Sequence, residues 1–253
     1  MKRFGWIILI VFLYLPIFLI GQNFESEIKK AEQYYAEAKY DSASLFYQKV
    51  LDNGYHSTDL YYNLANAFYK QDDIPSAILY YEKALKINPS NENVLFNLKL
   101  ANAHIQDKIE ALPVLFFIRW YIGLYNMFSV DNWAKISLVL FSIFALFSLF
   151  YFLGKSIYIR KTGFYFGLIF LFLSAAGLFL TYKKNASQQE RAYAIVFSPS
   201  ITVKSSPNEN GVDLFVMHEG SKLQIVDKVG QWCEIKIANG STGWIGIHTI
   251  RLI

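Results

Sequence analysis

Cysteine is almost absent from this sequence, with Cys233 the only one among 253 residues. An intramolecular disulfide is therefore excluded, and so is a zinc site built on a pair of cysteines. Cys233 falls in a predicted strand, in phase with Ile235 and Ile237, which indicates a small buried hydrophobic side chain. A redox-active thiol is the alternative, although apolar surroundings raise the pKa of a thiol and make it less reactive.

The usual patterns of catalytic and cofactor sites are missing as well. The four histidines are isolated from one another and from Cys233, so no pair has the spacing of a helical zinc site. The sequence contains no phosphate-binding GxxxxGK[ST] loop, no GxSxG elbow and no dinucleotide-binding fingerprint. We therefore expect a protein that is not an enzyme and has no catalytic residues, no metal site and no cofactor. An enzyme is the third hypothesis, after two kinds of binding protein.

Concentrated positive charge is lacking too. The net charge of +4 is modest, and part of it comes from lysines and arginines that flank apolar segments. A duplex-binding protein would normally gather such residues on one face of a folded domain. We expect no nucleic-acid partner.

Apolar residues are in excess, at 54% hydrophobic and 18% aromatic. Two charge-free stretches, residues 136–154 and 162–182, are each long enough to cross a hydrocarbon core of about 30 Å as a helix. The basic link between them, residues 155–161, matches the bias of cytoplasmic loops. The pattern predicts an integral membrane protein with transmembrane helices at 133–154 and 162–182 and a cytoplasmic link.

The N-terminus has the pattern of an export signal. It begins Met1-Lys2-Arg3 and continues without a charged residue from Phe4 to Phe24. Residues 1–21 are predicted to be either a cleaved signal peptide or an uncleaved signal anchor, and both interpretations remain open. Either one exports the residues after it, so we expect an inner-membrane protein of a bacterium with both soluble regions in the periplasm.

Residues 22–107 are strongly helical and self-similar at a spacing of 34 residues. Ala43 aligns with Ala77 and Tyr47 with Tyr81, so a small and a large residue recur where paired helices must pack. The pattern resembles the tetratricopeptide repeat. A third unit begins and then lapses, which indicates a capping helix at the end of the stack.

The resemblance implies that an extended partner peptide binds in the groove lined by the first helix of each pair. Asn63 and Asn97 are equivalent positions one repeat apart, and their amides can grip a peptide backbone at successive residues. Ordinary polar residues on an exposed helix face are the alternative. The groove positions of the family correspond here to Lys29, Glu32, Tyr35, Tyr62, Asn63, Asn66, Tyr69, Asn97 and Leu100.

From residue 191 to residue 253 the pattern changes to short strands separated by turn signals such as Asn239-Gly240. The spacing of tryptophan and glycine there resembles the bacterial SH3-like domain, a small all-β barrel. Trp232 and Trp244 lie out of phase with the aliphatic residues and are predicted to form a ligand face for peptide or peptidoglycan. A cover for an open barrel end is the alternative. The predicted strands are 192–197, 201–204, 222–229, 232–237 and 243–247.

Two segments join these parts. The junction at 108–132 contains Arg119, Trp120 and Tyr121, which suit the headgroup level of a bilayer. We expect it to be amphipathic and interfacial, with a buried core helix as the alternative. Residues 183–190 are expected to form a linker.

The predicted fold class is thus a multi-domain membrane protein, with all-α tetratricopeptide helix-turn-helix repeats, a two-helix transmembrane hairpin and a small all-β SH3-like barrel. This order, with the junction from Asp107 to Trp120, resembles the BatE family of tetratricopeptide proteins from the aerotolerance (Bat) operon of Bacteroidetes-type bacteria. The resemblance implies a non-catalytic periplasmic scaffold in tolerance of oxygen, with other Bat membrane proteins that carry von Willebrand A-type domains as partners. The alternative is an envelope sensor or cell-wall-binding protein that acts through the SH3-like domain.

Overall fold

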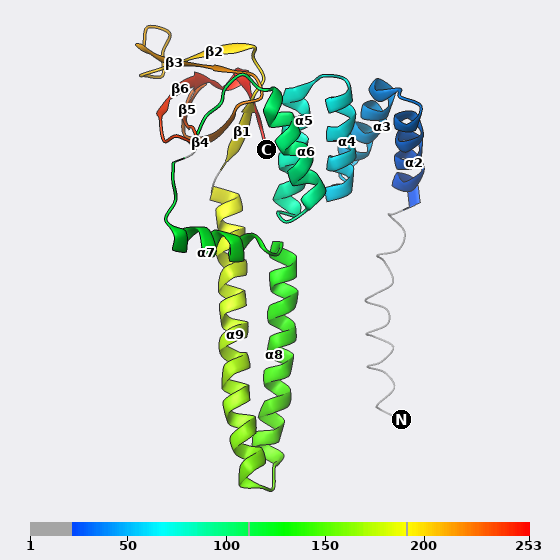
Figure 1. Ribbon diagram of the computed structural model, residues 1–253, viewed down its shortest axis with the longest axis vertical. Coiled ribbons are helices and arrows are strands. Elements are labelled where there is room, and N and C mark those ends of the chain that lie inside the picture. Colours follow the sequence, from blue (N-terminus) through cyan, green and yellow to red (C-terminus); the bar gives the residue numbers. More distant parts are fainter. Residues whose placement is uncertain (1–21, 111, 191) are drawn as a thin grey trace.

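The computed structural model describes residues 22–110, 112–190 and 192–253. The helices of residues 22–104, α2 to α6, stand in a row that ends against a curved β-sheet (Figure 1). Helices α8 (Val130–Leu153) and α9 (Ile157–Glu190) extend away from both as a hairpin, and α7 (Phe116–Asn126) lies across the end of the hairpin nearest the sheet (Figure 1). The predicted signal segment, residues 1–21, lies outside the described residues.

The row of helices forms the repeat domain, residues 22–104. Two of its helices begin at side-chain caps of the same kind: Ser57 Oγ accepts from the backbone N–H of Leu60, and Asp73 Oδ1 accepts from that of Ser76. The turn before the second helix of each pair is also repeated, because Ala38 and Asp72 both have positive φ, at 58° and 63°. The helices are α2 (Gln22–Ala36), α3 (Tyr40–Asp52), α4 (Thr58–Lys70), α5 (Ile74–Ile87) and α6 (Glu92–His104).

The predicted repeat packing is confirmed. Ala43 and Ala77 have no exposed surface, which lets neighbouring helices approach closely. Tyr47 and Tyr81 are almost fully buried beside them. Each small and large pair therefore serves the same packing role in both units, as the spacing of the sequence indicates.

The sheet domain, residues 192–253, is a seven-stranded antiparallel sheet in the order β3-β2-β6-β5-β4-β1-β7. Its core is made by inward-facing residues such as Val203, Leu223, Ile235 and Ile245. Cys233 is fully buried among them, as predicted. The strands are β1 (Tyr193–Val196), β2 (Ser200–Lys204), β3 (Asp213–His218), β4 (Lys222–Val229), β5 (Trp232–Lys236), β6 (Thr242–Gly246) and β7 (Ile250–Leu252).

Two of these strands, β3 and β7, are absent from the sequence-based prediction. Strand β3 points Met217 into the core but leaves Leu214 and Val216 about half exposed on its other side. Apolar residues on both faces hide the alternation that identifies a strand. Strand β7 is short, with a burial pattern that shows no alternation.

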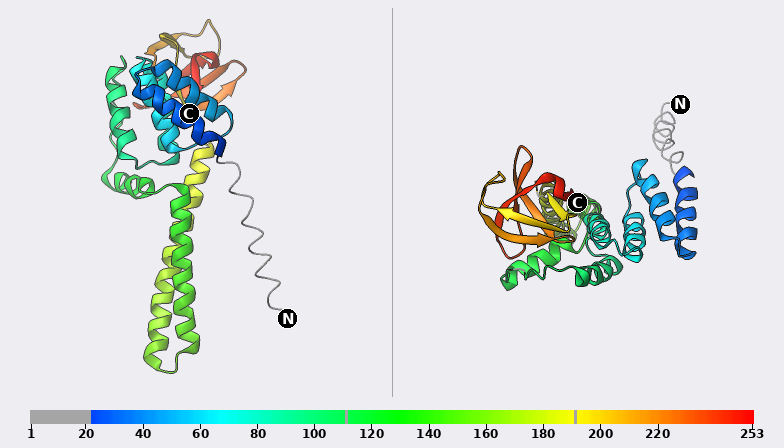
Figure 2. Two further views of the ribbon diagram at one scale, coloured as in Figure 1. Left: turned by 90° about the vertical axis from the view of Figure 1, so that its right-hand side faces the viewer. Right: turned by 90° about the horizontal axis from the view of Figure 1, so that it is seen from above.

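The repeat domain and the sheet domain share a core. Ile195 of β1 is fully buried in the same cluster as Ile78 of α5, and Ile105, Phe197 and Ile253 pack against that cluster. Seen from above, the row of helices ends against the sheet (Figure 2). Strand β1 thus packs on α5. It covers the apolar surface at the end of the helical stack, whose last helix is α6.

A polar cluster beside this shared core is centred on Asp107, which follows α6. Its carboxylate accepts hydrogen bonds from the backbone N–H and ring Nδ1 of His218, at 2.7 and 2.8 Å, and from Ser221 Oγ at 2.6 Å. Nearby, Lys222 Nζ lies 2.6 Å from Glu82 Oε2 of α5. Gly220 has a φ of +81°, and a Cβ there would stand 2.5 Å from Ile105. The close approach therefore requires glycine.

The segment after Asp107 continues along the sheet domain before it reaches α7. Ile109 packs on the core of the sheet, and the backbone N–H of Leu112 donates to Ala238 O at 3.2 Å. The predicted junction at 108–132 therefore has two parts. The first part is bound to the sheet domain, and the second contains α7 (Phe116–Asn126).

The hairpin consists of α8 (Val130–Leu153) and α9 (Ile157–Glu190). Helix α9 continues through residues 183–190, so the linker expected there is wrong, and helical backbone connects the hairpin to the sheet domain. Lys184, in this last part of α9, joins it to α7. Its side chain is buried and donates to the carbonyls of Tyr125 and Phe128 at the end of α7. A cation at these carbonyls caps the end of α7 and fixes it across α9.

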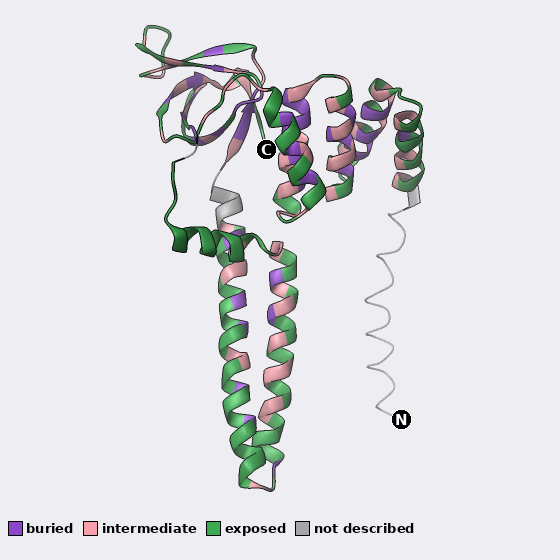
Figure 3. Cartoon of the chain, in the orientation of Figure 1, coloured by how far each residue is buried: buried purple, intermediate pink, exposed green. Residues whose placement is uncertain are grey.

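Both hairpin helices are long and apolar enough to cross a membrane. Only 6% and 22% of their most apolar stretches are buried, unlike the core helices of soluble proteins, and most of their surface is exposed (Figure 3). Small residues make one part of the contact between them: Ser174 Oγ donates to Ser137 O at 2.9 Å, and Gly177 leaves room for Ser137. Stacked rings make another, where Phe147 of α8 packs on Phe166 and Phe170 of α9. Small residues at the contact are typical of helix pairs in lipid.

We expect Asp107→Ala to destabilise the chain by about 1–3 kcal/mol, because the backbone N–H of His218 and the buried hydroxyl of Ser221 lose their acceptor. Chemical denaturation of the full chain in a mild detergent, followed by tryptophan fluorescence, measures the effect. Asp52→Ala, at an exposed position near the end of α3, is the matched control. Equal unfolding free energies for the two variants would contradict the role assigned to Asp107.

The hydrogen bonds of the Asp107 carboxylate make the stability of the fold depend on pH. Partial burial raises the pKa of Asp107, but the hydrogen bonds from Ser221 and His218 together outweigh it and hold the pKa below its ordinary value of 3.8. Because the folded pKa is lowered, the stabilisation is fully present above pH 3.8 and is lost as the pH falls through the lowered value. The unfolding free energy of the wild type should therefore fall more steeply below pH 4 than that of Asp107→Asn.

Candidate functional site

The predicted groove positions lie on α2, α4 and α6, the first helix of each pair. Lys29, Glu32 and Leu100 are exposed along it, and Lys29 forms an exposed ion pair with Glu25 at 2.7 Å. The remaining predicted positions are half-buried, namely Tyr35, Tyr62, Asn63, Asn66, Tyr69 and Asn97. Their exposed edges form a surface of aromatic rings, hydroxyls and amides.

A hydrogen-bond network crosses this surface from α4 to α6. Asn97 Nδ2 donates to Tyr62 Oη at 3.1 Å and to Asn66 Oδ1 at 2.9 Å. Tyr81 Oη of α5 donates to the same Asn66 oxygen at 2.6 Å. Asn66 therefore accepts two bonds and holds three helices together.

The structure gives Asn63 and Asn97 different surroundings despite their equivalent positions. Both amide hydrogens of Asn97 are directed at Tyr62 and Asn66. Among the described residues, no partner is recorded for the side chain of Asn63, so its donors and acceptor are available. Tyr62 acts as an acceptor for Asn97, which leaves its own hydroxyl hydrogen for another group.

The tyrosine hydroxyls near this network remain protonated. Burial is the largest effect that raises the pKa of Tyr35, and the neighbouring hydroxyls of Tyr40 and Tyr62 raise it further. Burial likewise raises the pKa of Tyr81, more than the nearby amide of Asn97 lowers it. Both tyrosines are neutral at physiological pH. Tyr81 Oη already donates to Asn66, whereas Tyr35 is half-buried and can be a donor to a peptide carbonyl.

Sequence reasoning assigned Tyr81 to the core and overlooked two other groove neighbours. His104 Nε2 lies 3.1 Å from Tyr69 Oη, and Tyr40 packs edge-on against Tyr35 with ring centroids 5.2 Å apart. His104 was not predicted because the repeat pattern of the third unit ends before this residue. Its position 35 residues after Tyr69, nearly one repeat, is the signal that could have identified it.

Trp232 and Trp244 lie on the same outer face of the sheet domain, on neighbouring strands β5 and β6. Glu234 pairs with Trp244 in this register and lies two residues after Trp232. Both tryptophans are half-buried, but only Trp232 borders the cavity of about 390 Å³ on this side of the sheet. The cavity is also lined by Glu209, Gln231 and His248. Of the two predicted residues, Trp232 is thus the one placed at a hollow that can hold a ligand.

Reactive and metal-binding groups do not gather in the part of the chain that the structure describes. Burial raises the pKa of the Cys233 thiol more than the nearby Lys228 lowers it, so the thiol stays protonated in the core. Residues 22–110, 112–190 and 192–253 contain no group of three His, Cys, Asp or Glu side chains placed to hold a metal ion. The described surfaces offer hydrogen bonds and aromatic faces.

These faces are those of binding modules, and comparisons with known families agree with both. Residues 58–91 match the tetratricopeptide repeat, and residues 199–249 match the bacterial SH3 domain. A comparison with curated proteins gives no match to this chain. The chain therefore contains a tetratricopeptide repeat, which indicates protein partners, and a bacterial SH3 domain, which indicates a cell-wall-binding role.

We expect Asn66→Ala to lower the unfolding free energy by about 1–3 kcal/mol, because the buried hydroxyl of Tyr81 would lose its acceptor. Asn63→Ala is the matched control on the same helix, and it should change the unfolding free energy by less than about 0.5 kcal/mol. Denaturant unfolding of the full chain in detergent measures both. A small loss for Asn66→Ala, equal to that of Asn63→Ala, would show that the network does not stabilise the groove.

Proposed function

We propose that this chain is a non-catalytic scaffold tethered to the bacterial inner membrane, whose groove holds an extended segment of a partner protein. The observation that carries the proposal is the polar face of the repeat helices: tyrosine and asparagine side chains of α4 and α6 meet there, and Asn66 cross-links α4, α5 and α6. A rigid face of this kind loses little conformational entropy when a peptide binds.

The groups available on this face suit a peptide backbone. The amide of Asn63 offers two donors and an acceptor, and the hydroxyl of Tyr62 offers a donor. Leu100 is 41% exposed and supplies an apolar contact beside them. Charged side chains on the face are few, so we propose recognition of an extended segment through its backbone and apolar side chains rather than through charge.

The tether we propose is the hairpin of α8 and α9, crossing the membrane twice. Its apolar surface, its length and its small-residue contacts support this placement. Both ends of the hairpin lie on the side of the repeat domain and the sheet domain (Figure 1). With the basic link at 155–161 in the cytoplasm, both domains lie in the periplasm.

We propose further that the scaffold belongs to a Bat complex that supports tolerance of oxygen or oxidative stress, with von Willebrand A-type membrane proteins as partners. The order of repeats, junction, hairpin and SH3 domain supports this assignment by its resemblance to the BatE family. The Asp107 junction adds support, because the segment that carries much of that resemblance joins the two domains.

The test is affinity purification of the full chain from a detergent extract of its own membranes. An isolated repeat domain is unsuitable because it would uncover the face of α5 that β1 covers. We expect Asn63→Ala with Leu100→Ala to reduce partner recovery by about tenfold, the effect of losing contacts worth about 1.4 kcal/mol. Mass spectrometry of the recovered proteins shows whether von Willebrand A-type proteins are among them.

The matched control is Asn102→Ala with Leu45→Ala, which changes the same residue types at exposed positions on α6 and α3 outside the groove. This control should recover as much partner as the wild type. Equal recovery by the groove variant would refute the groove as the binding site. Recovery of partners without von Willebrand A-type domains would agree with the scaffold function but contradict membership of a Bat complex.

A second candidate function is that of an envelope sensor that binds peptidoglycan through the sheet domain. The match to the bacterial SH3 domain and the cavity beside Trp232 favour it. The polar side chains of Glu209, Gln231 and His248 around an aromatic ring are typical of a glycan-binding hollow.

Sedimentation of the detergent-solubilised full chain with purified cell wall tests this candidate. We expect Trp232→Ala to reduce the bound fraction about tenfold through loss of the aromatic contact. Trp120→Ala, at a position on α7 that is 76% exposed, is the control and should bind as the wild type does. Absence of sedimentation by the wild type would exclude the sensor without affecting the groove.

A further inference from the structure

A cavity of about 690 Å³ lies where the repeat domain, the sheet domain, α7 and α9 meet. Four lysines line it, Lys86, Lys183, Lys184 and Lys222, and among its lining residues Glu82 is the only acidic side chain. We call this space the lysine cavity. Lys86 comes from α5, Lys222 from β4, and the other two from α9, so three separate parts of the chain supply the lysines.

The four lysines differ in what they already bind. Lys184 is buried and donates to the carbonyls of Tyr125 and Phe128, Lys222 pairs with Glu82, and Lys86 donates to Ile253 O at 3.0 Å. Lys183 is exposed, with its Nζ 5.9 Å from the centre of the Phe179 ring. In the described lining the four lysine side chains outnumber the one carboxylate side chain, and this excess of positive side chains favours an anion.

Part of the lining of the lysine cavity is apolar. Tyr121 and Ile122 of α7 and Phe179 of α9 line it, and they are 47%, 42% and 56% exposed. A simple anion would leave these surfaces in water. An amphiphile with an anionic head and a hydrocarbon tail could contact both the lysines and the apolar side chains.

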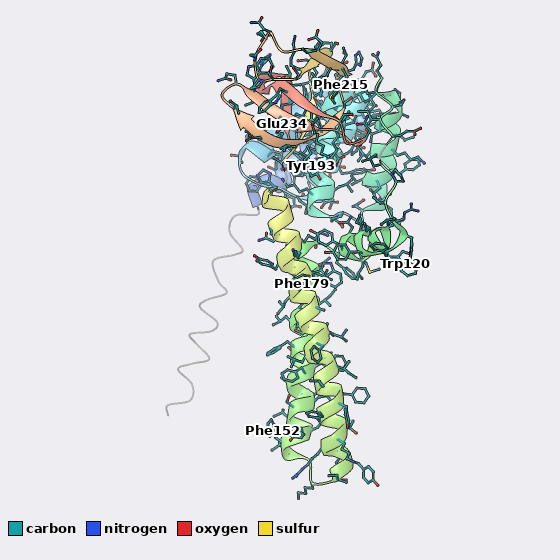
Figure 4. The ribbon with its side chains drawn as sticks, turned by 90° about the vertical axis from the view of Figure 1, so that its left-hand side faces the viewer. Trp120, Phe152, Phe179, Tyr193, Phe215 and Glu234 are labelled. Atoms are coloured by element: carbon teal, nitrogen blue, oxygen red, sulfur yellow. The ribbon has the colours of Figure 1, made fainter. Side chains whose placement is uncertain are left out.

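The lysine cavity also lies at the level of the proposed membrane surface. Phe179 is near the end of the apolar stretch of α9, and Tyr193 stands above it at the start of the sheet domain (Figure 4). Trp120, labelled on α7 in the same view, extends from the side of the molecule at this level (Figure 4). Phosphate groups of lipids occupy this level of a bilayer, with the acyl chains below.

We propose that the lysine cavity binds the phosphate headgroup of an anionic phospholipid, whose acyl chains lie along Phe179 and Ile122. This inference rests on the proposed membrane placement of the hairpin, but not on any partner of the groove. A lipid bound there touches α5, α7, α9 and β4 at once, so it stabilises the arrangement of the folded domains over the membrane.

The test is native mass spectrometry of the full chain in detergent micelles, titrated with phosphatidylglycerol or phosphatidylcholine of identical acyl chains. We expect the wild type to bind phosphatidylglycerol more tightly. Lys86→Gln with Lys183→Gln should weaken phosphatidylglycerol binding by about tenfold or more, since each basic residue near an anionic surface contributes about 1 kcal/mol. Binding of phosphatidylcholine should not change.

Lys228→Gln with Lys236→Gln is the matched control, at two exposed lysines of the sheet domain outside the cavity. A thermal unfolding midpoint equal to that of the wild type without added lipid shows that a variant is folded. Lys183→Gln alone is the second variant, because no hydrogen bond or ion pair of its side chain is recorded among the described residues, and it should weaken phosphatidylglycerol binding about fivefold.

Three outcomes would overturn the proposal. One is equal affinity of the wild type for the two lipids. Another is an equal loss of affinity in the cavity and control variants. The third is competition by glycerol phosphate or inorganic phosphate at the same concentration as the lipid, which would identify a free phosphate as the ligand. None of these affects recovery of a groove partner, so the lipid proposal and the scaffold proposal fail separately.

Discussion

The packing of β1 on α5 is the contact on which the rest of the structure depends. A tetratricopeptide stack needs a cover for its last helices, and here Ile195 of the sheet domain supplies it by entering the cluster around Ile78. The Asp107 carboxylate fixes the same boundary through His218 and Ser221. The predicted groove face and the outer face of the sheet domain are consequently held in one orientation, without a flexible linker between them, and any ligands of the two faces would meet in a fixed geometry.

The described structure also separates support from recognition within the groove. Asn66, Asn97 and Tyr81 bind one another, and their hydrogen bonds hold α4, α5 and α6 in register. Asn63, Tyr62 and Leu100 retain the groups that a partner can reach. The Trp232 cavity shows the same division, because Cys233 and Ile235 on the inner face of β5 build the core while Trp232 on the outer face borders the hollow.

Periodicity in the sequence predicted the parts whose packing is local. The recurrence of Ala43 and Tyr47 at Ala77 and Tyr81 identified the helix pairs, because those contacts form within one repeat. Strand β3 was missed because Leu214 and Val216 place apolar residues on its exposed side. The shared core and the lysine cavity could not be predicted, because residues such as Ile78 and Ile195 are distant in the sequence and no local pattern shows that they touch. The different surroundings of Asn63 and Asn97 likewise depend on which side chains of neighbouring helices reach them.

Asp107 and His218 are separated by 111 positions in the sequence, and the whole hairpin lies between them. During synthesis the repeat helices are made first, and the face of α5 around Ile78 stays uncovered until β1 has been made. The hairpin returns the chain to the side of the repeat domain. The two ends of the segment between Asp107 and His218 are therefore already near each other when the contact forms, which lowers the entropy cost of closing that loop. Insertion of α8 and α9 into a membrane would thereby become a step in completing the folded domains, and the repeat stack would be capped only after that insertion.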